Sequence, residues 1–95
     1  MLINSIIYTA DSIRNGRTPH SVLAYTMEEL GELATEVNII TGHSNKQTGP
    51  DGVVGEAVDA IICLVDLIHQ VNPAIREDDL YEICKEKLLK WKSKP

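Results

Sequence analysis

The segment from Asp51 to Val71 constrains the fold of this chain more than any other stretch. Its sequence, DGVVGEAVDAIICLVDLIHQV, predicts one long helix that is apolar on nearly every side, and such a helix is normally buried. It also carries Glu56, Asp59 and Asp66, which fall on one narrow stripe at about 100° per residue. Because buried carboxylates need a partner, this stripe predicts a cation nearby.

A second segment, from Met27 to Val37, repeats this arrangement of acids. It also predicts a helix, and its acids recur at helical spacing: Glu29, Glu32 and Glu36. Each of the two segments therefore presents an acidic stripe, and we expect the two stripes to face each other across a helical bundle.

Two carboxylate pairs stand out within these stripes, Glu29-x-x-Glu32 and Glu56-x-x-Asp59. If the two helices pack antiparallel, the four carboxylates converge and repel one another in a partly desolvated site. A divalent cation would relieve that repulsion, and an all-oxygen set suits Mg²⁺ or Mn²⁺ better than Zn²⁺. One such pair alone is common on a solvated helix face. The pair on the apolar helix is therefore the more informative one.

The whole chain predicts an all-α fold. Apolar residues at helical spacing, together with Gly16, Gly42 and Pro73 as stops, predict four helices at about 3–15, 19–41, 51–71 and 78–92. Thr18 and Asp51 are the predicted N-caps of the second and third helices. The length of 95 residues favours a single domain, 1–95.

Composition excludes some classes of protein. Aromatic residues make up only 4% of the chain, so the core must be built from aliphatic side chains. The net charge of −5 argues against a binder of nucleic-acid polymers, which would need a basic face. Cys63 and Cys84 lie within helical patterns and are expected to be reduced thiols of a cytoplasmic protein. No signal peptide is expected, and the acids of the third helix argue against a membrane span.

The order of the acids resembles a known family. The pattern Glu28-Glu29-x-x-Glu32, then twenty-three residues, then Glu56-x-x-Asp59 is similar to that of the MazG-like nucleotide pyrophosphohydrolases. These enzymes belong to the all-α nucleoside triphosphate pyrophosphatase superfamily. The flanking stretches MEELGELATEV and GEAVDAIICLVDLI fit as well, and the similarity covers about 18–91. It implies Mg²⁺-dependent hydrolysis of (deoxy)nucleoside triphosphates to monophosphate and pyrophosphate, for clearing unwanted nucleotides, with Mn²⁺ as a substitute metal.

The resemblance also implies roles for individual acids. The Mg²⁺ ligands would be Glu29, Glu32, Glu56 and Asp59. Glu28 would be the accessory acid that precedes them. A carboxylate not fully used by the metal would orient or deprotonate the attacking water, and the candidates are Glu28, Glu32 and Glu36, with Glu28 and Glu32 preferred. Asp66 is expected in a hydrogen-bond network or at an interface.

Substrate contacts are expected from the last helix. In the family this helix carries a Lys followed by an Arg for the triphosphate, whereas KEKLLKWKSK contains no arginine. Lys87 and Lys90 are the best matches, with Lys85 as an alternative. Trp91 would stack on the base or pack against a partner helix. His20 would approach the nucleotide or lie on the surface.

The apolar surface of the central helix exceeds what three short neighbours can cover. We therefore expect a homodimer, or a dimer of dimers, with a four-helix-bundle core across the interface. Two alternatives stay open: a phosphoribosyl-ATP or dUTP hydrolase of the same superfamily, and a non-catalytic helical interaction module whose acids are surface charge. A di-iron bundle would require Glu-x-x-His pairs, which both acidic motifs lack.

Overall fold

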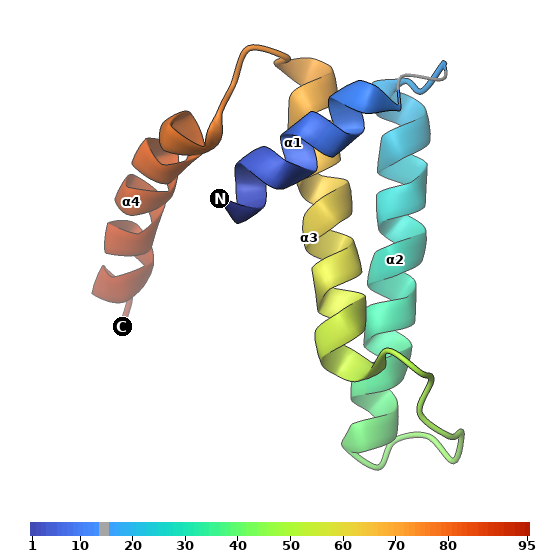
Figure 1. The fold of residues 1–95 in the computed structure, drawn as a ribbon. Coiled ribbons are helices and arrows are strands. Elements are labelled where there is room, and N and C mark those ends of the chain that lie inside the picture. Colours follow the sequence, from blue (N-terminus) through green and yellow to red (C-terminus); the bar gives the residue numbers. More distant parts are fainter. Residues whose placement is uncertain (14–15) are drawn as a thin grey trace.

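The computed structural model describes residues 1–13 and 16–95, and these form four helices with no strand among them. The helices are α1 (Leu2–Ser12), α2 (Pro19–Ile40), α3 (Gly52–Val71) and α4 (Glu77–Ser93). Helices α2 and α3 form a long antiparallel pair, α1 crosses the upper part of α3, and α4 stands apart (Figure 1). The all-α prediction with four helices is therefore confirmed.

The predicted bounds of α2, α3 and α4 agree with the structure to within a residue at each end, whereas the first helix is shorter than predicted. It ends at Ser12, and Ile13 closes it with a backbone N–H donated to the carbonyl oxygen of Ala10 at 3.3 Å. Residues 14 and 15 of the predicted helix lie outside the described residues. Gly16, the predicted stop, has a φ of +67°, a conformation that glycine adopts without strain.

The two predicted N-caps behave differently. Thr18 Oγ1 accepts a hydrogen bond from the N–H of Ser21 at 3.1 Å, and the Thr18 N–H donates to Ser21 Oγ at 2.9 Å. This reciprocal pair satisfies donors that a helix start leaves free. Asp51 occupies the N-cap position of α3, but its side chain makes no capping hydrogen bond to any described residue. The side-chain cap predicted for Asp51 is therefore wrong.

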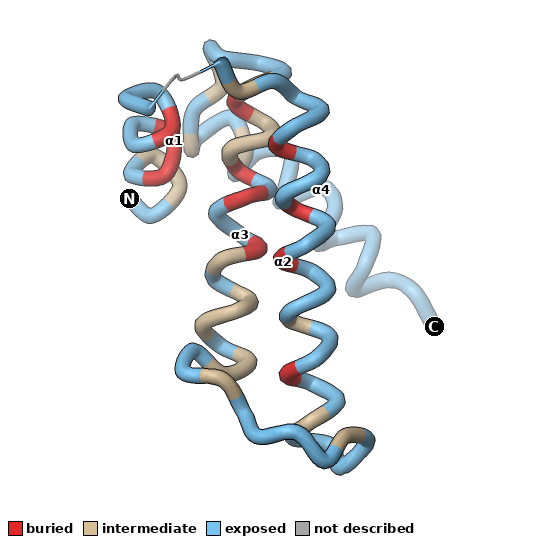
Figure 2. Tube along the Cα trace, turned by 90° about the vertical axis from the view of Figure 1, so that its right-hand side faces the viewer, coloured by how far each residue is buried: buried red, intermediate tan, exposed pale blue. Residues whose placement is uncertain are grey.

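The core lies where α3 meets its two neighbours. Ile6 and Ile7 of α1 pack on Val65 of α3, and burying such a side chain contributes about 1.5–3 kcal/mol. Several of the buried residues of α2 and α3 are small: Val22, Thr26, Ala60 and Cys63. Figure 2 shows that the buried positions of the long pair lie on the sides where α2 and α3 face each other. Small residues there bring the two helices, and hence the acids they carry, close together.

Asp66 has its own cation within the chain. Arg17 Nη1 donates to Asp66 Oδ2, and Arg17 Nη2 donates to the carbonyl oxygen of Ala10 at 3.0 Å. Arg17 therefore joins the C-terminal part of α1, the start of α2 and the C-terminal half of α3. It places Asp66 in a hydrogen-bond network, as the sequence predicted.

Helix α4 is attached through its first turn. The Asn4 Oδ1 atom accepts the N–H of Glu77 at 3.0 Å, and Glu77 Oε1 accepts the N–H groups of Ile3 and Asn4 at 2.8 and 3.1 Å. Each helix thus satisfies free donors at the start of the other. Beyond that turn α4 diverges, and none of its residues, all of which are described, is buried.

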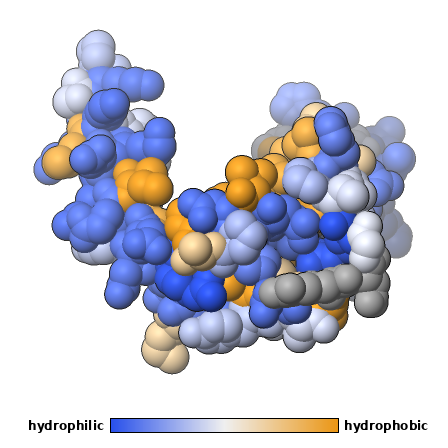
Figure 3. Space-filling model, turned by 90° about the horizontal axis from the view of Figure 1, so that it is seen from above, coloured by the Kyte–Doolittle hydropathy of each residue, from blue (hydrophilic) through white to orange (hydrophobic). Residues whose placement is uncertain are grey.

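Much apolar surface remains uncovered in one copy of the chain. On α3, Val54 is 78% exposed, and on α4 Leu89 and Trp91 are 69% and 72% exposed. Seen from above, the lobe formed by α4 stands across a hollow from the rest of the chain, with hydrophobic side chains on both sides (Figure 3). The central helix is therefore only partly buried. Among the described residues, none of the helices combines the length and apolar character that crossing a bilayer requires.

Candidate metal centre

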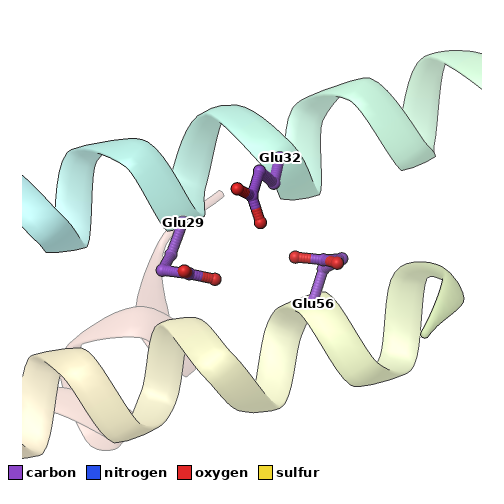
Figure 4. Close-up of side chains that lie close together, drawn as sticks. All are labelled: Glu29, Glu32 and Glu56. Carbon is purple, nitrogen blue, oxygen red and sulfur yellow. The ribbon is translucent and has the colours of Figure 1, made fainter. Parts of the chain in front are cut away.

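Three carboxylates converge between the two long helices. Glu29 and Glu32 project from α2 and Glu56 projects from α3, and all three point into the space between the helices (Figure 4). One oxygen from each side chain lies within 4.8 Å of one from each of the others. The i, i+3 spacing puts two acids on one side of α2, and the antiparallel partner brings in the third.

A second group overlaps the first. Carboxylate oxygens of Asp51, Glu56 and Asp59 also lie within 4.8 Å of one another. Glu56 belongs to both groups and joins them. The four acids predicted as ligands therefore lie in one continuous cluster, which Asp51 extends at the N-terminal end of α3.

Two oxygens in this cluster are buried and unsatisfied. Glu29 is only 7% exposed, and its Oε2 atom has no hydrogen-bond partner within the described part of the chain. Glu56 Oε2 is likewise buried and has no partner among the described residues. A buried carboxylate oxygen without a donor is costly, so both atoms favour a bound cation.

The electrostatics of the site support the same interpretation. Burial raises the pKa of Glu29, and the neighbouring carboxylates of Glu32 and Asp59 raise it further, while a hydrogen bond with Tyr25 lowers it. Burial, followed by contact with Glu32, raises the pKa of Glu56 to about 7. Close carboxylates that resist ionisation are the condition that a divalent cation relieves.

The donor set fits a hard cation. The cluster offers only carboxylate oxygens, which suit Mg²⁺ or Mn²⁺. Cys63 is the nearest soft donor on α3, and burial, with the charge of Glu29 next, raises the pKa of its thiol. Cys63 belongs to neither group of converging side chains, so among the described residues the cluster offers zinc no thiolate or imidazole ligand. Two oxygens bound to one Mg²⁺ lie at most about 4.2 Å apart, so small side-chain rotations would close the cluster.

The remaining acids of α2 differ in position. Glu28 is exposed and belongs to neither group, although its charge contributes to the raised pKa of Glu29. Glu32 reaches the cluster while staying exposed. Glu36 is buried but turned away from the cluster, since its carboxylate accepts hydrogen bonds from Thr48 and Gly49.

The structure does not bring the predicted substrate contacts to the acids. Lys87, Lys90 and Trp91 are exposed on α4, which stands apart from the α2–α3 pair in Figure 1. His20 is exposed in the first turn of α2, nine residues before Glu29, or roughly 13 Å along the helix axis at 1.5 Å per residue. In a single copy of the chain, none of these four residues lies at the cluster.

Sequence reasoning did not place two residues beside these acids: Asp51, and Tyr25, which it considered instead for contact with a base or sugar. Asp51 was interpreted only as a cap. It precedes Glu56 by five residues, however, and at that spacing the two carboxylates can lie close together. Tyr25 precedes Glu29 by one helical turn, and that i, i+4 spacing was the available signal. The negative charge of Glu29 is the main cause of the raised pKa of the Tyr25 hydroxyl.

Comparison with protein-family models, curated proteins and solved structures finds no match to this chain.

Proposed function

We propose that this protein is an Mg²⁺-dependent nucleoside triphosphate pyrophosphohydrolase of the MazG-like type. The observation that carries the proposal is the pair of buried carboxylate oxygens, on Glu29 and Glu56, that have no donor among the described residues. Glu29 lies on α2 and Glu56 on the antiparallel α3, and their carboxylates converge. The order of the acids along the chain is similar to the family pattern. The proposal includes the family assignment, which rests on this pattern.

The acids of the cluster divide into two roles in this proposal. The cation would be held by Glu29, Glu32, Glu56 and Asp59. When bound, Mg²⁺ would neutralise charge on the phosphate oxygens during cleavage of the α–β phosphoanhydride bond. Glu28 and Glu32 are exposed and lie one helical turn apart, and one of these carboxylates would orient or deprotonate the attacking water.

The substrate class follows from the same chemistry. A cluster of carboxylates repels a free triphosphate, so the substrate must arrive with a divalent cation or meet one already bound. We propose (deoxy)nucleoside triphosphates as substrates and a role in removing unwanted nucleotides. Phosphoribosyl-ATP and dUTP are the alternatives of the same class, because they present the same phosphate chain to the metal.

The basic groups for the triphosphate would come from a second copy. Leu89 and Trp91 are left exposed beside Lys87 and Lys90, while the α2–α3 pair holds the acids. We propose a homodimer, or a dimer of dimers, in which apolar faces of α3 and α4 are covered by the partner. In such a dimer the lysines of one copy would approach the acids of the other.

The test is pyrophosphate release from a panel of ribo- and deoxyribonucleoside triphosphates, with Mg²⁺ and with EDTA. Wild type should release pyrophosphate only with the metal. Glu56→Gln keeps the shape but removes the charge, and it should lower the rate by more than the roughly 10- to 100-fold typical of outer-sphere partners. Asp78→Asn, which removes the charge of an exposed acid in the first turn of α4, is the control and should leave the rate unchanged.

A second candidate, a helical interaction module, is favoured by the exposed apolar residues of α4. It predicts no release of pyrophosphate from any nucleotide and no rise in melting temperature with Mg²⁺. A folded wild type that fails both measurements would replace the enzymatic proposal with this one.

A further inference from the structure

Glu36 is the third acid of the α2 stripe, and the proposed chemistry leaves it without a task. It is only 7% exposed, and it lies outside both groups of converging carboxylates. A buried carboxylate must be compensated, and here each of the two oxygens has a hydrogen-bond donor. The Oε1 atom accepts from Thr48 Oγ1 at 2.7 Å and from the N–H of Gly49 at 3.1 Å, and Oε2 lies 3.2 Å from the same N–H.

These contacts anchor one end of the loop between α2 and α3. Thr48 and Gly49 lie at its C-terminal end, three and two residues before Asp51. A Cβ atom on Gly49 would lie 3.6 Å from Glu36 Oε2, so the backbone there is in contact with the carboxylate. Glu36 therefore attaches to α2 the stretch of chain that leads directly into the metal site.

Asp51 is also held from the other side. A Cβ atom on Gly55 would lie 2.5 Å from the Cβ atom of Asp51, closer than side chains tolerate, so only glycine allows this approach. The Gly55 N–H donates to the Asp51 carbonyl oxygen at 3.1 Å. Asp51 thus lies between the anchored loop and the first turn of α3, and its exposed carboxylate lies close to those of Glu56 and Asp59.

We propose that Glu36 is a positioning residue that acts through Asp51: by anchoring Thr48 and Gly49, it holds the Asp51 carboxylate at the cation site and thereby sets the affinity for divalent cations. The inference rests on the metal site of the proposed function, which the buried, unpartnered Glu29 oxygen supports independently. It assigns Asp51 to the site as an additional carboxylate.

The alternative is that Glu36 is itself a ligand, and the Gln substitution separates the two roles. Glu36→Gln keeps an oxygen that can accept from both Thr48 and Gly49, so an anchor survives the change. A ligand would not, because the negative charge is lost. Glu36→Ala removes the anchor altogether, and Thr48→Val removes one of its hydrogen bonds from the loop side.

The experiment measures Mn²⁺ binding from the electron paramagnetic resonance signal of free Mn²⁺, with melting temperature recorded for every variant. Glu36→Ala should weaken binding on the order of 10-fold, the size usual for residues that support metal ligands. Thr48→Val should weaken it in the same direction, and Glu36→Gln should stay close to wild type. If Glu36→Ala fails to fold, Thr48→Val carries the test alone.

Coupling to Asp51 is tested in a second background. In Asp51→Asn, the Glu36→Ala change should alter Mn²⁺ affinity by no more than about 2-fold, because its effect acts through the missing carboxylate. Gly55→Ala should weaken binding by displacing Asp51. The matched control is Gly31→Ala on α2, where a Cβ atom meets no described neighbour within 4 Å, and it should leave the affinity unchanged.

The outcomes separate this inference from the proposed function. If wild type binds no Mn²⁺, the metal site and the inference fall together. If wild type binds Mn²⁺ but Glu36→Ala binds it equally well, only the inference is overturned. Equal losses of Mn²⁺ affinity in Glu36→Gln and Glu36→Ala would make Glu36 a ligand. If Glu36→Ala lowers the affinity as much in the Asp51→Asn background as in wild type, the positioning role is also contradicted.

Discussion

Glu56 is the residue shared by the two clusters of converging carboxylates. It belongs to both, one of its oxygens is buried without a described partner, and burial is the main reason that its pKa is raised to about 7. A proton and a cation therefore compete for the same carboxylate. We expect metal binding to release protons and to weaken as the pH falls below 7.

The raised pKa of Glu56 predicts how the metal-free protein responds to pH. Its folded-state value of about 7 exceeds the ordinary value of 4.5, so the folded state holds the proton more tightly than the unfolded state. The free energy of unfolding should therefore fall as the pH rises from about 4.5 to 7, and then level off. Urea unfolding in EDTA at fixed protein concentration measures this trend.

Glu56→Gln is the matched control for this pH effect, because the amide cannot titrate. As the pH rises through this window, the free energy of unfolding of wild type should fall relative to that of the variant. Parallel pH profiles for the two proteins would contradict the assignment of the raised pKa to Glu56.

At the scale of elements, the start of α4 depends on a residue of α1. Asn4 accepts the N–H of Glu77, and Glu77 in turn accepts two N–H groups at the start of α1. Because no residue of α4 is buried, this exchange of caps and the ion pair between the Met1 amino group and Glu77 are the polar contacts that orient the helix. The direction of α4 in turn decides where the C-terminal lysines and Trp91 lie.

Asn4→Ala should therefore destabilise the protein by about 1 kcal/mol, the usual cost of a lost helix cap. Urea unfolding gives the total effect, and hydrogen exchange should show faster exchange at the first turn of α4. The control is Asn38→Ala on the exposed side of α2. That change should stabilise by a few tenths of a kcal/mol through helix propensity. Equal effects at both positions would show that Asn4 does not act as a cap.

At the scale of the whole molecule, apolar residues on α3 and α4 face solvent in one copy of the chain. The cleft between α1 and α4, lined by Leu2, Ile3, Leu80, Tyr81 and Cys84 with Glu77 at its edge, has a volume of about 440 Å³. Large apolar patches of this kind usually mark an interface. This surface is the structural basis for the proposed dimer.

Leu89→Gln tests that assembly, because Leu89 is 69% exposed and apolar area at an interface drives association. We expect wild type to sediment as a dimer and the variant to shift toward monomer, with a dissociation constant raised roughly 10-fold or more, as for the loss of one buried aliphatic side chain. Glu86→Gln places the same residue type one turn away on α4 and should not change the association. A wild type that sediments as a monomer at all concentrations would refute the dimer.

The parts of this fold that could be predicted from sequence are those with local signals. Helical periodicity and the Thr18 cap located the helices, and i, i+3 spacing brought Glu29 and Glu32 opposite Glu56. Contacts between distant residues had no such signal. Arg17 pairs with Asp66 across 49 residues, and Asn4 meets Glu77 across 73. The direction of α4, and with it the place of the predicted lysines, depends on such contacts.

The anchor at Thr48 and Gly49 also divides the loop between α2 and α3 into two functionally different parts. Residues 43–47 precede the anchor, and their hydrogen bonds are local: His43 to Thr41 and Asn38, and Lys46 to Ser44. A peptide inserted between Asn45 and Lys46 would lengthen the loop at a cost of only about 0.6 kcal/mol per doubling of its length. The upstream half is thus a natural insertion point for a reporter sequence, and the downstream half is not.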